Sequence, residues 1–393
     1  MAGATDQVSQ TRPQNEGRTD VPVAVTRKVT YILKTGASNL SMPYAVAVDG
    51  VVQKAYRDKP ARVSGASGKI VVQAAPGAKV TLYLNSDAHP SHRKEPVYLV
   101  TPAAHDVEVK ITEKTGKHSD ADTPTLVTSN AAKKLDSYTA PLTGDIWMKI
   151  SHKYAASEVD ALVPAGTGAE VKTAVQSIYN VLAKAELTLT VAATATKPAT
   201  QVVMTFADSN NPKENITAYG LLKDGLTRVH PGGFAALLNA AIAAGVTKLT
   251  MSSAWRPILG SIAHRAGLGL DVNYVGDTRM NREELRKAGA VDTSNVSAEE
   301  KRLLKEFEAA KAPQRGAAQT AWAAERDANE PAGVRAFRVS LAASPRVAQL
   351  FDPWFMDANT QDQAAATSNM QQSANETLHA HHLHVTVREP KIL

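Results

Sequence analysis

Residues 381–387 read HHLHVTV. Aliphatic and polar side chains alternate along this stretch with a period of two, which is typical of a β-strand with one face turned to a hydrophobic core. If Leu383 and Val385 face that core, His382 and His384 project together from the opposite face. The chain has only 11 histidines and no cysteine, and two neighbouring imidazoles on one face raise the question of a metal site, although a histidine cluster alone favours a surface segment.

A second stretch, GLDVNYV at residues 269–275, alternates in the same way and places Asp271 and Asn273 on one face. If the two strands are adjacent and antiparallel, Asp271 and His384 lie on one surface, and His264 enters from the segment before the second strand. Two imidazoles and one carboxylate are a common catalytic zinc set that leaves one position for water. The alternative is a flexible histidine-rich segment with an unrelated His and Asp. We favour the metal site, with Zn²⁺ bound by His264, Asp271 and His384.

The order of these residues resembles that of the LAS metallopeptidases. This superfamily of zinc enzymes includes D-alanyl-D-alanine carboxypeptidases and dipeptidases, penicillin-insensitive murein endopeptidases and phage endolysin peptidases. The resemblance rests on H-x6-D from His264 to Asp271, followed far downstream by H-x-H at His382 and His384. SSAWRP at residues 252–257 is similar to the Ser-x-x-Arg-Pro-type segment of the family.

The resemblance covers residues 169–388 and implies a role for each matching position. The three residues proposed above as ligands would bind zinc. His382 would act beside the metal as a base or stabilise the tetrahedral intermediate, and His379 would support it. Arg256 would hold a carboxylate or carbonyl oxygen of the substrate; the alternative is a salt bridge in an exposed loop.

The sequence departs from the family pattern in three ways. Ser261 is displaced by one residue relative to the usual Ser-x-His. His381 stands where the carboxypeptidase branch has a glutamate, while Glu376 precedes His379 by three residues, so a rival assignment uses Glu376 as base and His379 as ligand. The two-residue alternation of a strand argues against that assignment, because it places His379 on the same face as Leu383 if the strand extends so far. The segment between the two motifs is also long for the family.

The N-terminal part has a different pattern. From about residue 28, short runs rich in Val, Ile and Tyr alternate at period two, and Asp49-Gly50 between two of them indicates a two-residue hairpin. The fold class predicted is therefore a multi-domain chain, with an N-terminal all-β sandwich and a C-terminal α+β zinc peptidase domain that resembles the LAS fold and carries a helical insert. The expected parts are a disordered tail (1–20), the β-sandwich as an adaptor or binding domain (21–115), an unassigned linker (116–168) and the peptidase domain (169–393, with its insert at about 276–375).

Helix signals are clearest in the C-terminal part. Pro231 suits the first turn of a helix that Gly245 is placed to end. Ser297 and Glu300 form the pattern of a capping box. The stretch AGVRAFRVSLAASPRVAQLF, residues 332–351, continues the helical pattern, with Pro345 breaking or kinking it.

Composition narrows the classes of partner. Forty-four Lys and Arg against 38 Asp and Glu give a formal charge of +6, without a basic run interleaved with aromatics, so nucleic acid is not an expected partner. Without cysteine, disulfides and thiolate metal sites are excluded. No stretch approaches the ~18 apolar residues of a membrane span, and residues 1–20 lack the apolar run of a secretion signal.

Together these features predict a zinc-dependent peptidoglycan peptidase that cuts amide bonds of stem peptides or cross-links. We expect it to be made in the cytoplasm and to act in the periplasm or cell wall of a target bacterium after delivery. A secretion machine or phage tail would then be a partner of the N-terminal domain, and an inhibitor protein a further partner. The alternatives are a metal-containing cell-wall-binding protein without catalysis, and a zinc amidase.

Overall fold

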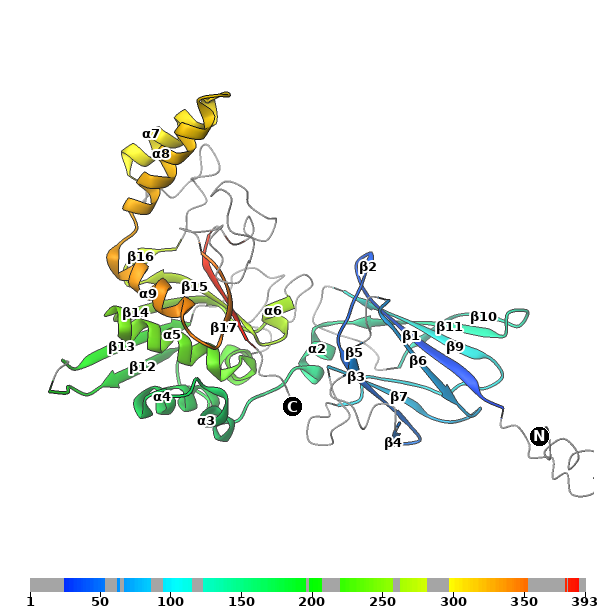
Figure 1. Cartoon of the computed structure of the whole chain (residues 1–393). Coiled ribbons are helices and arrows are strands. Elements are labelled where there is room, and N and C mark those ends of the chain that lie inside the picture. Colours follow the sequence, from blue (N-terminus) through cyan, green and yellow to red (C-terminus); the bar gives the residue numbers. More distant parts are fainter. Residues whose placement is uncertain are drawn as a thin grey trace, which may run out of the picture.

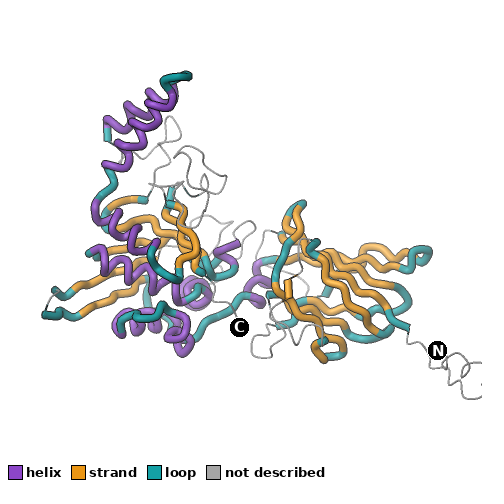
Figure 2. The backbone as a smooth tube through the Cα atoms, in the orientation of Figure 1, coloured by secondary structure: helices purple, strands orange, loops and turns teal. Residues whose placement is uncertain are grey.

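The structure, a computed structural model, divides into two units with separate hydrophobic cores (Figures 1 and 2). The N-terminal unit is built mainly of β-strands, and the C-terminal unit combines a β-sheet with helices, so the multi-domain α+β character is as predicted. Residues 1–20, expected to be a disordered tail, lie outside the described residues. The structure describes residues 25–53, 62–63, 67–85, 95–114, 123–195, 198–206, 220–256, 262–280, 297–352, 379 and 381–388.

The first sheet of the N-terminal unit has the strand order β10-β11-β9-β1-β2, with β6 also paired to β1. Both β1 and β11 run parallel to β9. The sequence predicted that this domain ends near residue 115, but the pairing of β11 with β9 carries the sheet on to Leu142. The strands are β1 (Arg27–Thr35), β2 (Ser38–Asn39), β6 (Lys69–Ala74), β9 (Asp106–Glu113), β10 (Thr125–Asn130) and β11 (Leu135–Leu142).

The second sheet packs against the first, because buried side chains of both sheets form one core. Asp49 and Gly50 join β3 to β4 with φ of 48° and 78°, which are the positive values of a type I′ turn, so the predicted hairpin is confirmed. The order is β4-β3-β7-β8, with β5 paired to β3. The strands are β3 (Pro43–Val48), β4 (Val51–Val52), β5 (Arg62–Val63), β7 (Val80–Leu84) and β8 (Tyr98–Val100).

The sheet of the C-terminal unit has the order β12-β13-β14-β15-β18-β17, with β16 paired to β15. The strand nearest the C-terminus, β18, is inserted between β15 and β17, so it is paired on both sides. This insertion brings residues near 270 and near 384 together. The strands are β12 (Glu186–Val191), β13 (Thr200–Phe206), β14 (Lys248–Ser253), β15 (Gly269–Val275), β16 (Thr278–Arg279), β17 (Val347–Phe351) and β18 (Leu383–Val387).

Helix α5 (Pro231–Ala244) lies against this sheet and is buried along most of its length. Proline occupies its first turn, and Gly245 ends it with φ of 68°, as the sequence predicted. A side chain at Gly233 would meet Leu270 and Val387, so the helix approaches the sheet closely there. Before α5 come α2 (Gly144–Ile150), η2 (Ala156–Glu158), α3 (Val159–Leu162), α4 (Ala169–Tyr179), the π-helical turn η4 (Leu221–Gly225) and η5 (Leu226–Arg228).

The segment predicted as a helical insert has two different parts. Helices α7 (Ala298–Ala309) and α8 (Arg315–Ala328) pack on each other around their own small cluster and stand apart from the sheet (Figure 1). Ser297 caps α7 by accepting a hydrogen bond from the backbone of Glu300. Helix α9 (Ala332–Ala342), by contrast, belongs to the main core.

One prediction in this segment is wrong. The helical pattern was predicted over residues 332–351 with a break or kink at Pro345; α9 does end before this proline, but residues 347–351 form β17, which pairs with β18. A short apolar stretch such as VAQLF suits either structure, and pairing with the neighbouring strand β18 selects the strand here. No helix among the described residues is both long and apolar enough to cross a membrane.

Candidate metal centre

The two strands that carry the predicted ligands are neighbours. β15 and β18 are antiparallel, and Asp271 lies directly opposite His384. Leu383 and Val385 lie in the core of the C-terminal unit, so the two polar side chains project from the other face. Asp271 and His384 are each only 3% exposed. A buried imidazole and a buried carboxylate side by side need a charged or hydrogen-bonded partner.

His264 comes from α6 (Ile262–Arg265), a single helical turn before β15. Its Nδ1 lies 2.6 Å from the backbone carbonyl oxygen of Ala254. Because a carbonyl oxygen only accepts, Nδ1 carries the proton, and in the neutral ring Nε2 then presents its lone pair. Nε2 faces Oδ1 of Asp271 at 3.2 Å and has no hydrogen-bond partner among the described residues. Two acceptors that face each other in a buried site fit a cation between them.

Oδ1 of Asp271 is the centre of the cluster. It lies 2.7 Å from Nδ1 of His384, 3.1 Å from Nε2 of His382 and 3.2 Å from Nε2 of His264. Burial alone would raise the pKa of this carboxyl group, but His264 and His382, by the positive charge of their protonated rings, hold the pKa well below its usual range. Asp271 is therefore a carboxylate at neutral pH, the form that binds a metal ion.

His384 is held from both ring nitrogens. Nδ1 points to Asp271, and Nε2 lies 3.1 Å from Oγ1 of Thr386, two residues further along the same face of β18. Burial lowers the pKa of His384 to about 4, although Asp271 opposes this shift. The ring is neutral at neutral pH, and when Nε2–H donates to Thr386, Nδ1 presents a lone pair beside the carboxylate.

Two overlapping groups among the described residues could hold a metal ion. The first is His264, Asp271 and His384, all buried, and the second is His379, His382 and His384; within each group the candidate ligand atoms lie within 4.8 Å of one another. His382 belongs to the second group and not to the first. The predicted ligand set is thus brought together as one group, with His382 beside it.

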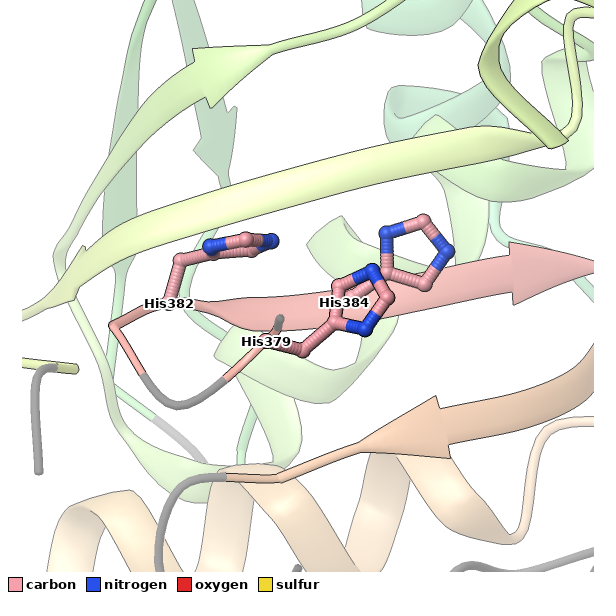
Figure 3. Close-up of side chains that lie close together, drawn as sticks. All are labelled: His379, His382 and His384. Atoms are coloured by element: carbon pink, nitrogen blue, oxygen red, sulfur yellow. The ribbon is translucent and has the colours of Figure 1, made fainter. Parts of the chain in front are cut away.

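Figure 3 shows His379, His382 and His384 gathered at the start of β18. The ring of His379 is stacked on Phe351 of β17, with centroids 4.6 Å apart and planes 5° apart, and it lies 4.5 Å from the ring of His384. The alternation of side chains along the strand was expected to place His379 on the face of Leu383, away from the cluster. That alternation does not reach His379, because β18 begins at Leu383 and His379 lies in a turn before it. Glu376, the base of the rival assignment, lies outside the described residues, as does Ser261.

Arg256 lies directly beside the cluster. Its Nη2 is 3.4 Å from Oδ2 of Asp271, and its side chain is mostly buried. The alternative of a salt bridge in an exposed loop therefore does not fit. The guanidinium group contacts the carboxylate oxygen that does not face the histidines, so Arg256 orients Asp271 whether or not it also contacts a substrate.

Sequence reasoning missed three supporting groups. Thr386 could have been found, because parity places it on the face of His384. The carbonyl of Ala254 and the ring of Phe351 left no such signal, since each reaches the cluster only through the folding of other strands. Phe351 lies opposite His384 in the pairing of β17 with β18.

No protein-family model, no curated protein and no solved structure matches this chain. The function proposed below therefore depends on the geometry of the cluster and on the motifs of the sequence.

The hydrogen bond to Thr386 gives a prediction. Thr386→Val keeps the shape of the side chain but removes the hydroxyl that orients His384. We expect the affinity for zinc to fall about 10- to 100-fold, the usual effect of losing a group that orients a ligand. Zinc titration against a chromophoric chelator measures this. Thr139→Val, in the N-terminal sheet, is the matched control, and equal affinities in both variants would contradict the role of Thr386.

Proposed function

We propose that this protein is a zinc-dependent peptidase that hydrolyses amide bonds in the stem peptides or cross-links of peptidoglycan. The observation that carries the proposal is the convergence of His264, Asp271 and His384 on one buried point. Nε2 of His264 has its lone pair turned towards Asp271, because its other nitrogen donates to Ala254.

The donor set suits zinc. Two neutral imidazoles and one carboxylate are a usual catalytic set for this ion, and the orphaned Nε2 of His264 has no other described partner. Hard cations such as Mg²⁺ and Ca²⁺ prefer oxygen ligands instead. When bound, zinc supplies Lewis acidity, which lowers the pKa of water and polarises a carbonyl group.

The remaining residues have roles that follow from where they lie. Nε2 of His382 is buried, lacks a described hydrogen-bond partner and lies 3.1 Å from Asp271, so it accepts a proton beside the ligand set. His379, stacked on Phe351, keeps water from one side of His384 and supports His382. Arg256 orients Asp271 and would contact a carboxylate or carbonyl oxygen of the substrate.

The substrate class rests on the motifs. H-x6-D followed by H-x-H, with Arg256 in SSAWRP, resembles the LAS peptidases, whose substrates are D-amino-acid peptides of the cell wall. Two alternatives share the metal site: an amidase that cuts between sugar and peptide, and a cell-wall-binding protein that keeps the ion for structure alone.

One experiment separates these functions. The purified chain is loaded with zinc and incubated with cell-wall sacculi, and the released fragments are identified by mass spectrometry. We expect one zinc ion per chain and muropeptides cut within the peptide. Fragments separated at the sugar–peptide bond would indicate the amidase, and stoichiometric zinc without released fragments would indicate the binder.

We further propose that the protein is a delivered antibacterial effector or phage-type lysin, in which the N-terminal unit serves as adaptor or wall-binding module. Expressed in the bacterial cytoplasm it should be harmless, because peptidoglycan lies across the membrane. Fused to a secretion signal it should cause rounding or lysis, and the same fusion with His384→Ala should not. Cytoplasmic toxicity that survives His384→Ala would point to a different target.

A further inference from the structure

The single turn α6 carries His264 but is too short to hold its own position. It contains four residues, fewer than an isolated helix needs for stability. The ring of His264 packs closely on Gly269, since a Cβ atom added at this glycine would lie 2.9 Å from ring atoms of His264. A small displacement of α6 would therefore move the ring relative to β15. Some other part of the protein must therefore fix α6.

The residue after His264 supplies that connection. Arg265 is 3% exposed, and its Nη1 forms an ion pair with Oε1 of Glu113, which is also 3% exposed. Glu113 is the last residue of β9 in the N-terminal unit, 152 positions earlier in the chain. A buried arginine is costly without a partner, so this pair holds the side chain in one place.

Groups from both units complete the contact. The guanidinium carbon of Arg265 lies 4.6 Å from the centre of the ring of Trp147, whose helix α2 packs in the N-terminal core. The backbone oxygen of Arg265 accepts hydrogen bonds from Oγ of Ser151 at 3.1 Å and from Nε1 of Trp255 at 3.1 Å. Arg265 is thus fixed at both its charged end and its backbone.

Helix α2 is itself tied to the C-terminal unit at its end. Nη1 of Arg228 donates to the backbone oxygens of Met148 at 2.8 Å and Ser151 at 3.0 Å, where the last carbonyls of the helix lack helical partners. The junction therefore has two arginines that both contact α2 or its end, and one of them, Arg265, belongs to α6.

We propose that Arg265 is a positioning residue, and that the N-terminal unit completes the metal centre by holding α6 through Glu113 and Trp147. This deepens the proposed function and rests on its metal site. The N-terminal unit then does more than deliver the catalytic unit, since the position of His264 depends on it.

Zinc affinity of the full chain tests the proposal. Glu113→Gln removes the charge and keeps the shape, and Arg265→Met removes the guanidinium group. We expect the dissociation constant for zinc to rise about 10- to 100-fold in each, as for a lost orienting group. The double variant should be no weaker than Arg265→Met alone, because both changes break one interaction.

Asp136→Asn is the matched control, because it removes a carboxylate of the same sheet that pairs with His105, away from α6. Its zinc affinity should equal that of the wild type. A folded Glu113→Gln protein with unchanged zinc affinity would overturn the proposal, whereas a zinc-loaded wild type that cuts no cell wall would contradict only the proposed function.

A second measurement needs no metal. In the metal-free full chain, amide hydrogen exchange of residues 262–268 should be at least about tenfold faster in Glu113→Gln than in the wild type, while β12 and β13 stay unchanged. Equal exchange rates of residues 262–268 in Glu113→Gln and in the wild type would also overturn the proposal. This test holds even if the chain binds no zinc.

Discussion

His264→Ala, Asp271→Ala and His384→Ala should each lose stoichiometric zinc. Each change removes one of the three proposed ligands, whose candidate ligand atoms lie within 4.8 Å of one another, so we expect the affinity to fall by more than the roughly 100-fold typical of an outer, orienting group. Metal analysis after dialysis and chelator competition measure the loss. Circular dichroism checks that each variant is folded.

His381→Ala is the matched control, because it alters an exposed histidine of the same HHLH segment. It should retain zinc with the affinity of the wild type. Loss of zinc in His381→Ala together with retention in His384→Ala would contradict the pairing of Asp271 with His384. Retention of zinc in all four variants would mean that the ion is bound elsewhere and that this cluster is only an Asp–His hydrogen-bond network.

The second large effect concerns His382. Its Nε2 is as near to Asp271 as that of His264, at 3.1 Å against 3.2 Å, but His382 does not belong to the group that contains His264. A fourth protein ligand would also fill the position that hydrolysis needs for water. His382→Ala should therefore keep near-stoichiometric zinc and lose about two to four orders of magnitude in turnover, the usual scale for a general acid–base group.

The comparison that isolates His382 is the ratio of turnover to bound zinc. In Thr386→Val this ratio should stay near that of the wild type once zinc is saturating, and in His382→Ala it should fall. Turnover like that of the wild type in zinc-loaded His382→Ala would remove this residue from the mechanism and favour Glu376 as the base. Loss of zinc in His382→Ala would instead make it a fourth ligand.

The local sequence pattern was sufficient to predict several features of the fold. The alternation of HHLHVTV and GLDVNYV predicted two strands with Asp271 and His384 on one face, and these strands pair with the two residues opposite each other. Asp49-Gly50, Pro231 and Gly245 predicted a turn and two helix ends for the same kind of reason. In each case the preference belongs to a few neighbouring residues and their backbone angles.

Pairing between distant segments was not accessible in this way. The end of the N-terminal unit was placed near residue 115, because the parallel pairing of β11 with β9 leaves no local signal. Residues 347–351 were expected to be helical, because their apolar pattern suits a helix or a strand and only the neighbouring β18 selects the strand.

The sequence by itself determined the types of the candidate ligands, their order along the chain and the strand face on which Asp271 and His384 lie, because these follow from side-chain chemistry and the two-residue period of a strand. Only the tertiary structure decided the tautomer and charge of these side chains and their positions in space. The carbonyl of Ala254 sets which nitrogen of His264 is free, and burial keeps His384 neutral. The ion pair of Arg265 with Glu113 joins residues 152 positions apart, and an interaction over such a distance exists only once both units have folded and come into contact.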